Sequence, residues 1–112
     1  MSLRDKVRAA DDRKTEIIDV PEWDVKIKIV EMSGRQRGEM VDRVQDKKYM
    51  YADVLIALAV DPHTEEPAFD PADRDWLADK SGAVLDRVAS AIIKLSGISV
   101  EEAEKELEAN PV

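Results

Sequence analysis

The sequence predicts an α+β fold, mostly α, with an N-terminal β-hairpin packed on a bundle of about four helices. Apolar and polar residues alternate within residues 15–32, which is the period of a half-buried strand. Apolar residues recur at helical spacing through most of residues 33–110. Polar pairs that cap helices precede several of these stretches. A chain of 112 residues suits one domain, so we predict a single domain over residues 1–112.

The first predicted element is a short helical segment within residues 1–14. Leu3, Val7 and Ala10 share one helical face, and Ser2 precedes them as a candidate N-cap. The segment is charged and terminal, so we expect it to fray.

The hairpin is predicted over residues 15–32. Its apolar positions are Ile17, Ile18, Val20, Val25, Ile27 and Ile29. The Pro-Glu-Trp-Asp sequence of residues 21–24 separates the two apolar runs and suits a turn. Two strands alone are marginally stable, so one face of the hairpin must pack on helices. A homo-oligomer would extend the hairpin edge to edge.

The predicted helical part begins at Ser33, which can form a capping box with Gln36. The apolar face that follows runs to about Val60. The pattern leaves open whether this stretch is one helix or two, broken near residues 47–49. The prolines and clustered polar residues of residues 61–67 predict a loop.

Three more helices are predicted beyond this loop. Asp70 and Pro71 supply an N-cap and a first helical position, which open a short helix. A longer amphipathic helix covers about residues 81–96, and Gly97 ends it. The last helix is predicted over residues 99–109.

The charge is acidic and unevenly distributed, with a formal net charge of −8. Residues 61–80 hold seven acids against two bases, and residues 99–112 hold five against one. Residues 33–48, in contrast, hold five bases against three acids. An acidic surface repels phosphate backbones, so this distribution favours protein partners over nucleic acid.

Two further features of the sequence exclude some classes of protein. The chain has no cysteine, which excludes disulfides and thiolate metal sites. Its longest apolar run, residues 54–60, is far shorter than the roughly 20 residues that span a bilayer. We therefore expect a soluble, cytoplasmic protein without membrane contact.

The sequence offers little for catalysis. Its one histidine, His63, lies in an acidic polar loop, where a lone histidine is usually solvated. Ser33 and Ser81 fit helix starts better than nucleophiles. The four glycines are isolated and form no phosphate-binding loop. We predict no enzymatic activity, no metal and no cofactor.

Three passages of the chain, in the order in which they occur, indicate a family of proteins. The first is the hairpin TEIIDVPEWDVKIKIVEMSGRQRGEM, and the second is LIALAVDPHTEEPAFDPADRDWLADKS, an apolar stretch followed by an acidic turn and a short acidic helix. The third is VLDRVASAIIKLSGISVEEAEKELEANP, an amphipathic helix followed by an acidic one. Together, over about residues 15–110, they resemble the tail assembly chaperones of long-tailed bacteriophages, which are encoded just before the tape measure protein.

The resemblance implies an adaptor. Such chaperones bind the long, largely helical tape measure protein, keep it soluble and recruit tail tube subunits around it. The resemblance also implies that the protein acts in the bacterial host cytoplasm, is absent from the mature virion and has no cofactor. In many such phages a ribosomal frameshift makes a longer form as well.

The family has no fixed binding residues, so the partner-binding residues are predicted from side-chain chemistry. They are Trp23, Met40, Val44, Tyr51 and Phe69. An exposed indole at Trp23 would anchor a partner, but a turn tryptophan more often folds back over its sheet, and we favour that position.

Two functions of other classes stay open. One is a structural connector or completion protein of a phage particle, which would use the hairpin edge as an oligomer contact. The other is an acidic mimic of nucleic acid that inhibits a DNA-binding enzyme. A mimic would need the acids of residues 61–80 and 99–112 to line one surface at phosphate-like spacing.

Overall fold

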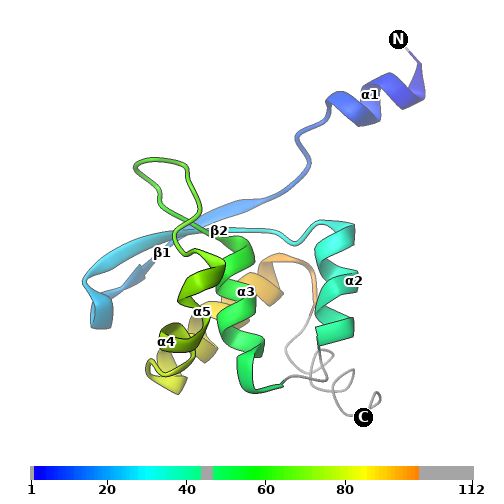
Figure 1. Cartoon of the computed structure of the whole chain (residues 1–112). Coiled ribbons are helices and arrows are strands. Elements are labelled where there is room, and N and C mark those ends of the chain that lie inside the picture. The colour runs from blue at the N-terminus through cyan, green and yellow to red at the C-terminus, as the bar shows by residue number, and fades with distance from the viewer. Residues whose placement is uncertain (1, 44–46, 99–112) are drawn as a thin grey trace.

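The computed structural model describes residues 2–43 and 47–98 (Figure 1). Its helices and strands in chain order are α1 (Leu3–Ala9), β1 (Thr15–Val20), β2 (Val25–Val30), α2 (Gly34–Arg43), α3 (Met50–Leu58), β3 (Ala59–Val60), α4 (Arg74–Ala78) and α5 (Gly82–Leu95). Short 3₁₀ turns occupy Pro21–Trp23, Lys47–Tyr49 and Pro71–Asp73. This confirms the predicted α+β fold, mostly α. The helix predicted over residues 99–109 lies outside the described residues.

The predicted hairpin is formed by β1 and β2. They pair antiparallel along their whole length, from Thr15 opposite Val30 to Val20 opposite Val25. Pro21 starts the connecting 3₁₀ turn, where its fixed φ is an advantage. Asp24 ends the turn in the left-handed region at φ 52°, which short polar side chains tolerate.

β3 is a strand that the sequence pattern did not predict. The apolar stretch was expected to stay helical to about Val60, but α3 ends at Leu58, and the next two residues pair with β2. Ala59 has extended dihedral angles, and its C=O accepts a hydrogen bond from the N–H of Ala68 at 2.9 Å. The sheet edge therefore overrides the helical period of the local sequence.

Two helices, α2 and α3, occupy the stretch whose helix number was left open. The predicted capping box opens α2: the Ser33 Oγ accepts from the N–H of Gln36 at 3.2 Å. In return, the Gln36 Oε1 accepts from the N–H of Ser33 at 3.0 Å. The 3₁₀ turn Lys47–Tyr49 leads into α3.

α5 is the central helix of the core. The Ser81 Oγ caps it by accepting from the N–H of Val84 at 3.4 Å, and Gly97 follows it at φ 78°. Its buried residues are Val84, Leu85, Val88, Ala89, Ile92 and Ile93. They form one apolar cluster with the inner face of the hairpin and with α3, so the helices supply the cover that two strands need.

A buried serine joins α5 to the end of the hairpin. The Ser96 Oγ accepts a hydrogen bond from the N–H of Met32 at 2.9 Å and donates one to the C=O of Ile92 at 2.8 Å. Both contacts are buried, so the hydroxyl satisfies a backbone N–H that would otherwise lose its partner in the core.

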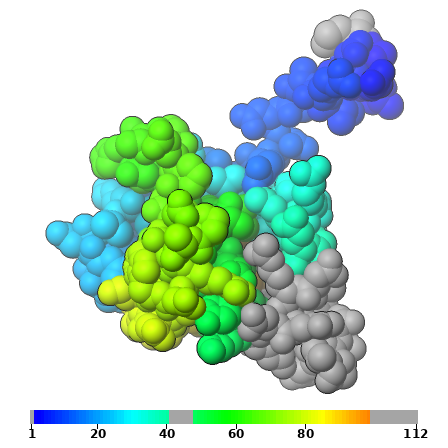
Figure 2. All heavy atoms as spheres, in the orientation of Figure 1, coloured from blue at the N-terminus to red at the C-terminus, as the bar shows by residue number. Residues whose placement is uncertain are grey.

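α1 stands clear of the other elements (Figures 1 and 2). Ser2 caps it as predicted, since its Oγ accepts from the N–H of Asp5 at 3.2 Å. None of its residues is buried, and Leu3 and Val7 are 80% and 65% exposed. The apolar face of α1 is therefore uncovered in the isolated chain.

Within residues 2–43 and 47–98, no helix is both long enough and apolar enough to traverse a bilayer.

Candidate partner-binding groove

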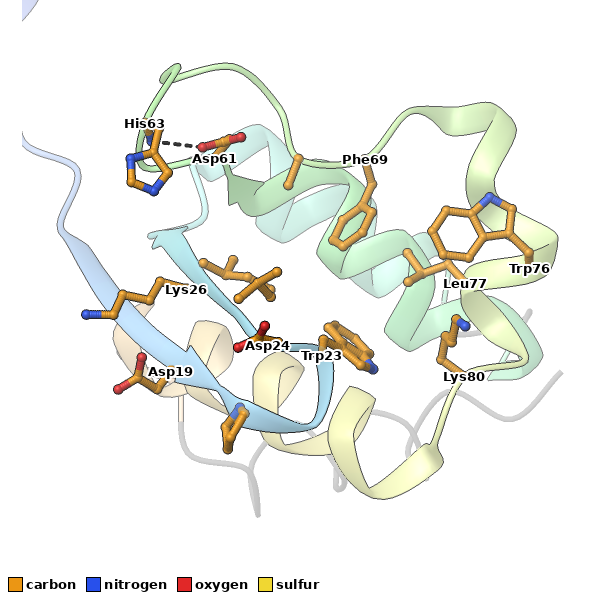
Figure 3. Close-up of a pocket in the computed structure, with 14 residues that line it drawn as sticks. Asp19, Trp23, Asp24, Lys26, Asp61, His63, Phe69, Trp76, Leu77 and Lys80 are labelled. Carbon is orange, nitrogen blue, oxygen red and sulfur yellow. Dashed lines mark hydrogen bonds between the residues drawn. The ribbon is translucent and has the colours of Figure 1, made fainter.

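An open groove with a volume of about 1130 Å³ lies between the first half of β2 and the segment that carries Phe69 and α4 (Figure 3). Asp61 and His63 lie toward one end of it, and Trp23 and Lys80 lie toward the other. Small-molecule sites usually enclose roughly 300–1,000 Å³ and surround their ligand. The larger, open shape of this groove suits a polypeptide better.

Aromatic side chains form the apolar wall of the groove. The rings of Phe69 and Trp76 meet edge to face, with centroids 6.2 Å apart and planes at 67°. Leu77 is buried beside them, whereas Trp76 is 48% exposed. Trp23 reaches the groove from the hairpin side. Partly exposed tryptophan beside buried apolar groups is typical of the residues that dominate protein interfaces.

The capping box of residues 70–73 orients the exposed indole. The Asp70 Oδ1 accepts from the N–H of Ala72 at 2.9 Å, and the Asp73 Oδ2 accepts from the N–H of Asp70 at 2.8 Å. The other carboxylate oxygen of Asp73 accepts from the Nε1–H of Trp76 at 3.1 Å. The same carboxylate therefore starts the helix and fixes the aromatic ring.

An arginine clamp attaches α4 to α3. The guanidinium of Arg74 donates from Nε and Nη2 to the two carboxylate oxygens of Asp53, at 2.9 and 3.0 Å. The guanidinium carbon lies 4.0 Å from the ring centroid of Tyr49, whose hydroxyl donates to the Asp75 Oδ1 at 2.9 Å. Bidentate pairing and stacking together fix the position of Arg74, so α4 is held at a defined distance from the core.

A second ion pair attaches the hairpin turn to α5. The two Nη atoms of Arg87 donate to the two carboxylate oxygens of Glu22, each at 2.7 Å. Hydrogen bonds from Arg87 and from the backbone N–H of Glu22, with the positive charge of Arg87, lower the pKa of Glu22 from its ordinary 4.5 to about 2. Because Trp23 follows Glu22 directly, this pair also fixes the end of the groove.

This ion pair predicts a pH dependence of stability. The pKa of Glu22 is lower in the folded than in the unfolded state, so its stabilising effect is complete above pH 4.5 and is lost as the pH falls toward 2. Arg87→Gln should remove the effect and return the Glu22 carboxyl to its ordinary titration range. Carbon-detected NMR titration of that carboxyl checks this, with Lys94→Gln on the same helix as the control. A midpoint that Arg87→Gln leaves near 2 would contradict the assignment.

Polar contacts hold the loop of residues 61–67 beside the groove. The Lys28 Nζ pairs with the Glu65 Oε2 at 2.7 Å, which attaches residues 61–67 to β2. The N–H of His63 donates to the Asp61 Oδ1 at 2.8 Å, and His63 is exposed, as expected for a solvated histidine. Among the residues in the structure's described ranges, no three histidine or carboxylate side chains are placed to hold a metal ion. The groove thus offers apolar contact area with a charged rim.

The serines considered as nucleophiles both act as helix caps. Ser33 caps α2 and Ser81 caps α5, which confirms their predicted structural role.

The structure brings together two of the five residues predicted to bind a partner. Trp23 and Phe69 line the same groove, and Trp23 also packs against the core, as predicted for a tryptophan that folds back over its sheet. Met40 lies in a separate small hollow of about 30 Å³ between α2 and α3. Tyr51 is half-buried against the core and lines neither cavity. Val44 lies outside the described residues.

Trp76 is the groove residue that the sequence prediction missed. The sequence does contain an indication of its exposure, because a capping aspartate, Asp73, stands three positions before Trp76. The structure adds that α4 has only five residues. So short a helix can bury little of its surface, and a large aromatic residue beside its single buried residue, Leu77, stays accessible.

Comparison with known proteins finds no matching family model, no matching curated protein and no matching solved structure.

Proposed function

We propose that this protein is a phage tail assembly chaperone that binds the tape measure protein in the bacterial cytoplasm and recruits tail tube subunits. The observation that carries the proposal is the open aromatic groove formed by Trp23, Phe69, Trp76 and Leu77. Apolar side chains that the fold leaves accessible in a hollow surface favour a protein partner. The chain resembles the chaperone family over about residues 15–110.

The charge of the chain supports reversible binding. The net charge of −8 keeps such a protein soluble while its apolar groove contacts a hydrophobic partner. Lys80 and Lys26 stand at the groove beside Asp19, Asp24 and Asp61. A rim of mixed charge sets the orientation and rate of association more than its affinity.

A recruiting adaptor needs two separate surfaces, and residues 2–43 and 47–98 offer two candidates. The groove lies beside α4, whereas the uncovered apolar face of α1 stands at the far end of the molecule (Figure 1). Leu3 and Val7 mark the α1 face. We propose the groove for the tape measure protein and the α1 face for the tube subunits.

The decisive test is co-expression with the large helical protein encoded immediately downstream. We expect the downstream protein to become soluble and to co-purify with this chain on size-exclusion chromatography. A downstream protein that stays insoluble while this chain elutes alone would overturn the tape-measure assignment. Rings or filaments of this chain alone would instead favour the structural connector, with the open edge of β1 as its contact.

The nucleic-acid mimic is the weaker alternative because most of the acids of residues 61–80 have structural partners. Asp70 and Asp73 cap a helix, Asp75 accepts from Tyr49, and Glu65 pairs with Lys28. The positions of these carboxylates are set by their contacts within the fold, so they do not reproduce the regular spacing of phosphates.

A further inference from the structure

The strand that floors the groove has an unpaired edge. β2 pairs with β1 along all six of its residues, but on its other side only Lys28 and Ile29 are paired, with Val60 and Ala59. Within the described ranges, no residue pairs with Val25–Ile27 on that side. These residues line the groove (Figure 3).

The ladder geometry shows which backbone groups face the groove. In an antiparallel ladder, successive residues direct their N–H and C=O alternately to the two neighbouring strands. The N–H of Glu31 donates to the C=O of Lys14 at 2.8 Å, so the odd-numbered residues of β2 face β1. The backbone groups of the even-numbered residues Lys26 and Lys28 therefore face the other edge. Lys28 stands opposite Val60 there. Lys26 thus presents a backbone donor and acceptor to the groove.

The side chains beside this edge have a matching period. Val25 and Ile27 stand opposite Val20 and Ile18, which places them on the inner face of the hairpin, the face toward Phe69 and Leu77. A strand added here would direct every second side chain into the apolar wall. The residue between them, opposite Lys26, would point to the outer face of the sheet.

We propose that the groove binds an extended segment of a partner protein, which adds to β2 as a strand beside Lys26 and inserts two apolar side chains at alternate positions. A helical segment has already paired its own backbone groups, so it cannot use those of Lys26. An extended segment satisfies them and fills the apolar wall at the same time. The occupant is therefore an extended segment with apolar side chains at alternate positions, and this inference rests on the proposed function only in taking the groove as a protein-binding site.

The test uses a displayed library of random 12-residue peptides, selected on the full chain and then measured singly on three variants. Lys26→Pro removes the N–H that faces the groove and spares the ladder with β1, because proline is tolerated at a sheet edge. Lys26→Ala removes the ammonium group and keeps the N–H. Ile17→Pro places the same change on the open edge of β1. Thermal unfolding of each variant verifies that the hairpin is intact.

We expect the selected peptides to carry apolar residues at alternate positions and to lose about tenfold or more in affinity for Lys26→Pro. Ile17→Pro should bind within about twofold of the unaltered chain, and Lys26→Ala, which keeps the backbone N–H, should lose clearly less affinity than Lys26→Pro. Amide hydrogen exchange of the unaltered chain should slow at Lys26 when peptide is bound. Peptides that bind Lys26→Pro equally well, or leave exchange at Lys26 unchanged, would overturn the proposal, and loss confined to Ile17→Pro would move the site to β1.

The peptide-binding experiment and the co-expression experiment can succeed or fail independently. Co-purification with the downstream protein that survives Lys26→Pro would leave the chaperone function standing and overturn strand addition as its mode of binding. Peptide selection that meets the expectation without co-purification would retain the groove site and overturn the tape-measure assignment.

Discussion

Trp76→Ala is expected to reduce capture of the proposed partner, the tape measure protein, by about 30-fold, because an interface tryptophan commonly contributes 2 kcal/mol or more. The indole is 48% exposed, its Nε1–H donates a hydrogen bond to Asp73, and the Nζ of Lys80 lies 5.9 Å from its ring centroid. Its loss therefore removes contact area from the groove with little effect on the core. Binding is measured by co-purification yield and by titration calorimetry with the solubilised partner.

Two controls separate the groove from other apolar surfaces. Ile17→Ala removes a side chain that is 58% exposed on the outer face of β1, and we expect it to leave capture unchanged. Met40→Ala tests the hollow between α2 and α3, because Met40 was also predicted from the sequence to bind a partner. If Met40→Ala impairs capture and Trp76→Ala does not, the partner binds over α2 and α3 and the groove assignment is wrong.

Features with a short-range cause were predictable from the sequence. Ser33 and Ser81 cap α2 and α5, the helices that they were expected to start, and Asp70 caps the 3₁₀ turn that leads into α4, because an N-cap depends on residues two or three positions ahead. The hairpin followed from alternation and from a turn that begins with Pro21. These signals lie within a few residues of the structure that they predict.

Features that depend on distant residues were not predictable. β3 exists because Ala59 and Val60 meet an edge of β2 formed about thirty positions earlier. Arg87 and Glu22 are 65 positions apart, so no local pattern connects them. The groove has the same cause: Phe69 and Trp23 were predicted singly from their chemistry, but only the fold places them on one surface. Trp76 lies on the same surface because the carboxylate of Asp73 accepts a hydrogen bond from its indole N–H and fixes the ring beside the groove.

Leu77→Ala is expected to cause the largest loss of stability among the groove residues, about 3 kcal/mol in the free energy of unfolding. Leu77 is 1% exposed and is the single buried residue of α4. Truncation leaves a cavity beneath a five-residue helix that has no other fully buried residue. For a chain near 100 residues, this corresponds to a decrease in Tm of more than about 10 °C.

The same substitution distinguishes two ways of holding α4. Leu95→Ala truncates a half-buried leucine of the same core and should cost about half as much, so it is the matched control. Urea unfolding measures both variants. If Leu77→Ala lowers the midpoint no more than Leu95→Ala does, α4 is held mainly by the pair between Arg74 and Asp53. If Leu77→Ala lowers the midpoint as expected, the wall of the groove and the stability of the core both depend on the Leu77 side chain. Evolution at position 77 is then constrained by folding, even where binding would permit change.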